Sequence, residues 1–284
     1  MSEDWIIEAN DATFECAVLD RSDAVAFVVD FWAPWCAPCR TLGPQLEKLA
    51  RQYQGEFILA KVNLDDNPGL GQAFRIQSIP ALVGIRQRRA VAQIVGAVPE
   101  AELKRFIEQV LPSVAERLAA EAEKLAVGGR ADEAERQFAR ALEVDGRCDA
   151  ALYGMAKLLA QRGEDAAALE HLDRLLPGPL SEAADRLGAE IRLKAGAEFD
   201  EVEMRTKLDA DPDDLEARFE LAESLAAAGR YGDALAELLD LVRRDREFRD
   251  GAARMAMLDI FEVLGAQHPD VERYRAELGK VLFS

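Results

Sequence analysis

A recurrence of about 34 residues in the second half of the chain restricts its fold more than any other feature. The segment GGRADEAERQFARALEVD at 128–145 recurs as RGEDAAALEHLDRLL at 162–176 and as AGRYGDALAELLDLVRRD at 228–245. Gly129 and Gly163 are 34 residues apart, and Gly229 follows 66 residues later, close to two further periods. Chains with such a period form solenoids, in which each unit buries its apolar face against its neighbours.

Each unit is predicted to contain two helices. After Pro112 the residues Ala, Leu, Glu and Arg dominate, and apolar residues follow the i, i+3, i+4 spacing of a helix. We expect the glycines at the turn between the helices, and we expect Ala134, Ala168 and Ala234 where the helices pack closely. The pattern resembles the tetratricopeptide repeat, and it predicts units at about 115–148, 149–180, 181–214 (degenerate) and 215–248, followed by a C-terminal helical cap.

Residues 1–112 differ in composition and apolar pattern from the rest of the chain. The length of 284 residues is sufficient for two domains. Apolar, β-branched runs at 25–31 and 57–64 predict buried strands, and leucines at helical spacing predict a helix at 40–53 between them. Strand, helix and strand in this order form a parallel βαβ unit. Runs at 79–85 and 90–95 predict an antiparallel hairpin, and a helix at 100–111 ends before Pro112.

The charge balance excludes several classes of partner. The chain has 35 Lys and Arg against 53 Asp and Glu, a formal net charge of −18, of which −14 lies after Pro112. Such a chain repels nucleic acid and anionic membranes. No apolar run approaches the roughly 18 residues of a membrane helix, and the start MSEDWIIEAN lacks the basic and apolar regions of a secretory signal. We therefore expect a cytoplasmic protein.

The pentapeptide Trp35-Cys36-Ala37-Pro38-Cys39 lies where the first strand leads into a helix. A helix N-terminus stabilises a thiolate through unpaired backbone N–H groups, and the thiolate is the species that attacks a disulfide. Cys36 is therefore the expected nucleophile. Cys39, one turn later and more covered, is placed to resolve the mixed disulfide.

A zinc site is the competing interpretation of two cysteines at this spacing. It requires a second pair of ligands, whereas the other candidates, namely Cys16, Cys148, His171 and His268, are solitary and far apart in the sequence. We expect neither a metal nor a cofactor. Cys16 is expected to be a small buried hydrophobe. Cys148 is expected to be partly exposed between two repeats, as an incidental loop residue rather than as a second thiol that traps clients.

Two charged residues interrupt the buried strands beneath the pentapeptide. Asp30 lies in the first strand and Lys61 in the second. A buried carboxylate is costly unless it is paired or serves the chemistry. The two residues can form a structural ion pair. Alternatively, burial raises the pKa of Asp30, which then exchanges a proton with Cys39; its position relative to Cys39 favours this second interpretation.

Three segments resemble thioredoxin over residues 5–112: VVDFWAPWCAPCRTLGPQLEKLA, AKVNLDDNPGLGQAFRIQSIPAL and VGAVPEAELKRFI. The resemblance implies a thioredoxin fold, with Cys36 as nucleophile and Cys39 as resolving cysteine. It implies that Asp30 is the buried proton-transfer aspartate and that Lys61 is its companion.

The same resemblance implies a substrate-binding surface around the two cysteines. Pro80, otherwise a simple strand-start proline, takes the place of the family's cis-proline. Ile79 supplies backbone that pairs with substrate, and Gly96 borders the substrate groove. Trp35 and Pro38 complete the surface. Ala37 replaces the usual glycine between the cysteines, so the redox potential is not carried over, and RQRR at 86–89 replaces an Asn-Gly-like turn.

A thioredoxin-like domain followed by such repeats is similar to the bacterial chaperedoxin family, CnoX (also called YbbN). This resemblance implies a holdase for unfolded or oxidation-sensitive clients, with hand-over to the GroEL-type chaperonin and the DnaK system. Two alternatives stay open: a thiol-disulfide reductase, served by thioredoxin reductase, whose repeats dock one folded partner, and a scaffold with a vestigial redox domain. The last segment, 274–283, either caps the repeats or docks a chaperonin.

Overall fold

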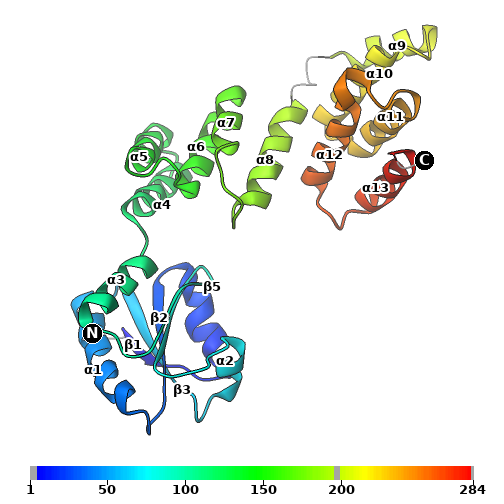
Figure 1. Ribbon diagram of the computed structural model, residues 1–284. Coiled ribbons are helices and arrows are strands. Elements are labelled where there is room, and N and C mark those ends of the chain that lie inside the picture. The colour runs from blue at the N-terminus through cyan, green and yellow to red at the C-terminus, as the bar shows by residue number, and fades with distance from the viewer. Residues whose placement is uncertain (1–4, 195–198, 283–284) are drawn as a thin grey trace. The chain divides into compact units, whose positions relative to one another are not determined.

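The computed structural model describes residues 5–194 and 199–282, which fall into two compact units. The first unit extends to Arg117 and the second begins at Leu118. The expected boundary at Pro112 lies five residues earlier. Figure 1 shows a sheet in the first unit, while the described part of the second consists of helices and their connections.

The sheet of the first unit has five strands in the order β1-β3-β2-β4-β5, namely β1 (Ile6–Glu8), β2 (Ala26–Trp32), β3 (Phe57–Asn63), β4 (Ala81–Arg86) and β5 (Arg89–Val95). The β2 and β3 strands are parallel, and β4 and β5 form an antiparallel hairpin, as the sequence predicts. The strand β1, parallel to β3, was not predicted, because three residues are too few for a periodic signal.

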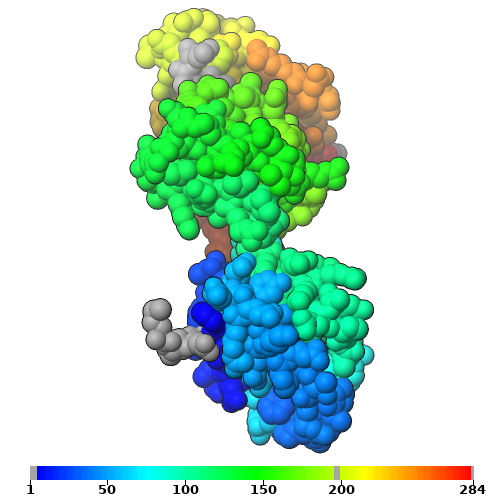
Figure 2. All heavy atoms as spheres, turned by 90° about the vertical axis from the view of Figure 1, so that its left-hand side faces the viewer, coloured from blue at the N-terminus to red at the C-terminus, as the bar shows by residue number. Residues whose placement is uncertain are grey.

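Helices cover both faces of this sheet (Figure 1). On one face, α1 (Ala37–Gln52) and α3 (Glu100–Val110) bury Leu46 and Ile107 against β2, β3 and β4. On the other face lie α2 (Pro68–Ala73) and two short helical turns, Glu15–Leu19 and Asp20–Asp23. Val18 from the first turn and Leu70 from α2 join a second apolar cluster around Phe27 and Phe31. Figure 2 views the first unit from the side of α1 and α3.

The rest of the described chain forms helices in successive pairs: α4 (Val114–Val127) and α5 (Ala131–Val144), α6 (Asp149–Gln161) and α7 (Asp165–Leu172), α8 (Ser181–Lys194) and α9 (Glu201–Ala210), α10 (Leu215–Ala227) and α11 (Tyr231–Arg244), and finally α12 (Ala252–Leu264) and α13 (Pro269–Leu282). A 3-10 turn, Phe248–Gly251, precedes the last pair.

The small residues of the recurrence lie where close packing requires them. Gly129, Gly163 and Gly229 have φ of 76°, 78° and 74°, the left-handed conformation that ends one helix and begins the next. Ala134, Ala168 and Ala234 are fully buried. Both observations agree with the expected geometry of the repeat. In the degenerate unit, residues 195–198 lie outside the described residues.

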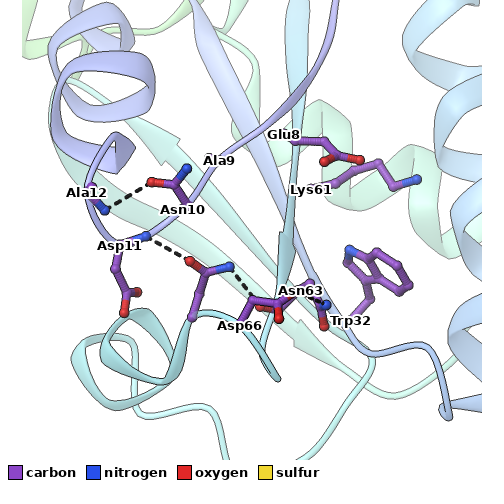
Figure 3. Close-up of a pocket in the computed structure, with 10 residues that line it drawn as sticks. Glu8, Ala9, Asn10, Asp11, Ala12, Trp32, Lys61, Asn63 and Asp66 are labelled. Carbon is purple, nitrogen blue, oxygen red and sulfur yellow. Dashed lines mark hydrogen bonds between the residues drawn. The ribbon is translucent and has the colours of Figure 1, made fainter.

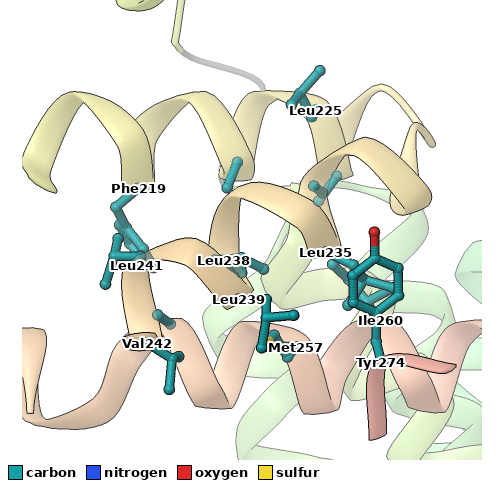
Figure 4. Packing of buried hydrophobic residues seen from close by; sticks show 14 of the residues in the cluster. Phe219, Leu225, Leu235, Leu238, Leu239, Leu241, Val242, Met257, Ile260 and Tyr274 are labelled. Carbon is teal, nitrogen blue, oxygen red and sulfur yellow. The ribbon is translucent and has the colours of Figure 1, made fainter. Parts of the chain in front are cut away.

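The last two helix pairs share one apolar core, in which Leu235, Leu238, Ile260 and Tyr274 meet (Figure 4). The α13 helix lies against α11 and buries Val271 and Leu278 as well. This is the packing that a capping helix requires. Phe283, at the end of the expected apolar tail, lies outside the described residues.

Gly154 in α6 provides a test of the close approach between α5 and α6. A Cβ atom on Gly154 would lie 2.2 Å from Cζ of Phe138, which is buried. Helix propensity alone predicts that Gly154→Ala stabilises the fold by about 1 kcal/mol. Because overpacking costs about 1–3 kcal/mol, we expect the free energy of unfolding to fall instead, as measured by urea unfolding followed by circular dichroism.

Gly279 in α13 is the matched control, because a Cβ atom there meets nothing within 4 Å. Gly279→Ala is expected to leave stability unchanged or to raise it by up to about 1 kcal/mol. A Gly154→Ala variant as stable as the wild-type chain would contradict the packing of α6 on Phe138.

Candidate active site

Cys36 and Cys39 form a disulfide at the start of α1. Cys36 is the N-cap residue, and its Sγ accepts a hydrogen bond of 3.2 Å from the backbone N–H of Cys39. Pro38 in the first turn has no N–H to satisfy. The sulfur of Cys36 thus faces the positive end of the helix dipole. Both cysteines are 4% exposed, so the expectation that Cys39 is the more covered does not hold in the disulfide form, where the bond brings both sulfurs into one apolar cluster.

The disulfide lies between a buried apolar cluster on one side and the exposed Trp35 side chain on the other. Ala33 is buried with the two cysteines, and Trp32 and Ile79 pack against this cluster. Trp35 is 69% exposed. Its Nε1 donates a hydrogen bond of 3.1 Å to Asp65, in the loop after β3.

The predicted substrate-binding residues from the β4–β5 region lie beside this cluster. The Ile79-Pro80 peptide bond is cis, as the thioredoxin resemblance implies. The N–H of Gly96 donates a hydrogen bond of 2.7 Å to the carbonyl oxygen of Pro80. Gly96 has a φ of 94°, which favours glycine. Residues from opposite ends of the hairpin are thereby held together.

Asp30 is a buried carboxyl group in β2. It is 2% exposed, and its Oδ1 has no hydrogen-bond partner among the described residues. Burial raises the pKa of Asp30 to about 6, against a smaller lowering by Lys61 and with a further raising contribution from Glu47. A carboxyl group with this pKa can both accept and donate a proton near neutral pH.

Lys61 is the register neighbour of Asp30 across the β2–β3 pair, yet the ion pair between them, the alternative interpretation of the sequence, does not form in the described part of the chain. The Nζ of Lys61 lies 2.8 Å from Oε1 of Glu47 on α1, and 5.6 Å from the centre of the Trp32 ring. Lys61 and Glu47 are both partly exposed. Their pairing avoids the desolvation that an ion pair at the buried Asp30 carboxyl would require.

Sequence reasoning missed two partners of the predicted residues, Glu47 and Asp65. A glutamate on an amphipathic helix is typical of a solvated face, and nothing in its spacing indicates which side chain it contacts. Only the placement of α1 over β3 brings Glu47 to Lys61, and only the loop after β3 brings Asp65 to Trp35.

The two remaining cysteines differ from expectation. Cys16 is exposed rather than buried. It lies in a single short helical turn, Glu15–Leu19, whose buried residue is Val18. Cys148 is 4% exposed rather than partly solvated, because it is the residue from which α6 begins, packed between helices. Within residues 5–194 and 199–282, no three His, Cys, Asp or Glu side chains gather in a way that could hold a metal ion.

Comparison with known proteins agrees with this geometry. The thioredoxin family profile matches residues 5–109. The thioredoxin of Chlorobaculum thiosulfatiphilum is 43% identical over 102 residues, which are 36% of this chain and 93% of that protein. Thioredoxin 1 of Nostoc sp. is 43% identical over 104 residues, 37% of this chain and 95% of that protein. The chain belongs to the thioredoxin family.

Beyond its thioredoxin domain, the chain matches two tetratricopeptide repeat profiles, at residues 119–186 and 194–283. The thioredoxin of Haemophilus influenzae is 42% identical over 109 residues, which cover 98% of that protein but 38% of this chain. The protein is therefore a thioredoxin domain followed by tetratricopeptide repeats. No helix among the described residues is both long enough and apolar enough to cross a membrane.

The raised pKa of Asp30 in the thioredoxin domain has a consequence for stability. The native state binds the proton more tightly than the unfolded chain, whose aspartate has the ordinary value of 3.8, so the stability contributed by protonation is lost as pH rises from about 4 to about 6. We expect Asp30→Asn to raise the free energy of unfolding at pH 8 by up to about 3 kcal/mol, and to have little effect below pH 4.

Tryptophan fluorescence during urea unfolding of the oxidised protein measures this effect, because all three tryptophans, Trp5, Trp32 and Trp35, lie in the thioredoxin domain. An equal change in stability at pH 4 and pH 8 would contradict the raised pKa of Asp30.

Proposed function

We propose that this protein is a redox-linked holdase: its repeats bind unfolding proteins, and its Cys36–Cys39 pair protects or reduces the cysteines of those clients. The observation that carries the proposal is the fusion itself. A domain with a disulfide at a helix N-cap and a buried carboxyl group is joined in one chain to a helical repeat array. Linking the two raises the effective concentration of a bound client's cysteines at the exchange site.

The exchange begins with the reduced pair. The thiolate of Cys36 attacks one sulfur of a client disulfide, a mixed disulfide forms, and the other client sulfur leaves as a thiolate. Asp30 accepts the proton of the Cys39 thiol. The Cys39 thiolate then attacks Cys36, which restores the Cys36–Cys39 disulfide and releases the client as a dithiol. Thioredoxin reductase in the cytoplasm would reduce the pair again.

The surface around the disulfide suits an extended client chain. Ile79 packs against the disulfide cluster, and Gly96 is hydrogen-bonded to the neighbouring Pro80; we assign to the backbone of both residues the pairing with the client backbone. Trp35 and Pro38 are exposed beside Cys36 and would contact client side chains. Lys61 does not belong to this surface; it is the register neighbour of Asp30 on β3.

The repeats supply apolar surface for holding a client. A groove of about 210 Å³ between α8, α10 and α12 is lined by Phe219, Met255 and Ala256, and Met255 is 52% exposed. Charged side chains, including Glu223 and Arg192, line the same groove. The net charge of −14 after Pro112 would keep a loaded complex soluble through self-repulsion.

Transfer of clients to the GroEL-type chaperonin and the DnaK system belongs to the proposal through the chaperedoxin resemblance. The buried face of α13 packs on the preceding helices, which leaves its outer face for such a contact. Pull-down of the chaperonin and of DnaK by the full chain, against an isolated thioredoxin as control, tests this step.

The second candidate is a dedicated thiol-disulfide reductase whose repeats dock one folded partner. The disulfide between Cys36 and Cys39 and the raised pKa of Asp30 support this candidate.

Trapping separates the two candidates. With Cys39→Ser the mixed disulfide on Cys36 cannot be resolved, so clients stay covalently attached. We expect a broad set of aggregation-prone proteins when trapped complexes from cells under oxidative stress are identified by mass spectrometry. The Cys36→Ser/Cys39→Ser variant is the control for captures through Cys16 or Cys148. One or two folded partners would support the reductase instead.

Two assays in vitro test the two proposed activities, disulfide reduction and the holding of unfolding proteins. Cys36→Ser is expected to lower the rate of insulin reduction roughly 100-fold or more, because it removes the nucleophile. The same variant is expected to suppress light scattering by a thermally unfolding client as well as the wild-type chain does. If neither chain suppresses this aggregation, with or without hypochlorite, the holdase proposal is wrong.

A further inference from the structure

Three carboxylates lie around Lys61. It lies in register between Glu8 on β1 and Asp30 on β2, so these side chains share one face of the sheet. The α1 helix packs over that face and contributes Glu47. Figure 3 shows Lys61 between Glu8 and Trp32, at the wall of a pocket of about 470 Å³.

Lys61 pairs with only one of these carboxylates in the described structure. Its Nζ lies 2.8 Å from Glu47 and is held over the ring of Trp32. The Oδ1 of Asp30 is left buried without a hydrogen-bond partner among the described residues. An ammonium group placed beside Asp30 would stabilise the ionised carboxylate and weaken it as a base.

We propose that Glu47 is a positioning residue, whose carboxylate holds the Lys61 ammonium away from Asp30 and so keeps Asp30 able to take the proton of Cys39. Glu47 acts through Lys61 and does not touch the reacting sulfurs. This inference rests on the exchange chemistry proposed above, but its decisive measurement does not require a client.

Few charged groups face Asp30. Lys61 approaches from β3 and lowers the pKa of Asp30, whereas Glu47 from α1 raises it. From β4, the register neighbour is the buried Leu82. Burial is the largest cause of the raised pKa of Asp30, ahead of both charges. The opposing effects of Lys61 and Glu47 on the pKa of Asp30 are thus the contribution that a single substitution can change.

The test is an NMR titration of the Asp30 carboxyl carbon in the oxidised full-length protein. In Glu47→Gln we expect the Asp30 midpoint to fall by about one pH unit, because the released ammonium moves toward Asp30. In a Lys61→Met background the same substitution is expected to cause a clearly smaller fall, because only the direct charge of Glu47 on Asp30 is then lost. Glu100→Gln is the matched control, since Glu100 pairs with Lys48 and Lys104 at the surface, and it should not shift Asp30.

Two outcomes would overturn the inference. An unchanged midpoint in Glu47→Gln would show that Glu47 does not restrain Lys61. An equal fall in the Lys61→Met background would show that Glu47 acts by its own charge and not by positioning. Unchanged far-ultraviolet circular dichroism of each variant checks that the protein remains folded, since the fluorescence of Trp32 would itself respond to a moved Lys61.

Insulin reduction provides the second readout. When kcat/KM for insulin reduction is plotted against pH, one limb of the curve follows the titration of Asp30. In Glu47→Gln this limb is expected to move to lower pH by the same shift as the NMR midpoint. If the wild-type chain does not reduce insulin at all, the reductase part of the proposed function fails while the NMR titration still decides the role of Glu47. If insulin is reduced but the profile does not move with the midpoint, the link from Glu47 to exchange is wrong.

Discussion

The packing of α1 across β2 and β3 is the contact on which the redox chemistry depends. It buries the leucines of α1 against the sheet and aims the N-terminus of the helix at Cys36. The same packing removes Asp30 from water, which raises its pKa toward neutrality. One apolar interface therefore prepares both the sulfur proposed to attack and the carboxyl group proposed to take the proton.

The repeats depend on a different constraint, the distance between neighbouring helices. Fully buried alanines and left-handed glycines let successive helices approach and reverse. At Gly154 the approach is so close that the ring of Phe138 occupies the space of a Cβ atom. The contacts between repeats leave the outer side chains free of this constraint, so the acidic residues can serve solubility, and the groove beside Met255 is the surface proposed to bind clients.

The charged residues of the thioredoxin domain show how ion pairing can differ from what strand register alone suggests. The thioredoxin domain shares about 43% of its residues with the thioredoxins of Chlorobaculum thiosulfatiphilum and Nostoc sp.. In this chain the Lys61 ammonium pairs with Glu47, both side chains being partly exposed, and Asp30 keeps an unpaired oxygen among the described residues. A buried acid and its neighbouring lysine are thus not a simple ion pair, because desolvation opposes their contact.

The order of residues was sufficient to predict the strands β2 to β5, the helix after Cys36, the disulfide pair and the 34-residue helical units, because each leaves a periodic or local signal. Strand β1 leaves none, being three residues long. The exposure of Cys16, the burial of Cys148 and the pairing of Lys61 with Glu47 were decided by the tertiary structure alone. A side chain's burial and its choice among several partners depend on which elements pack over it, and the spacing of residues along the chain does not contain that information.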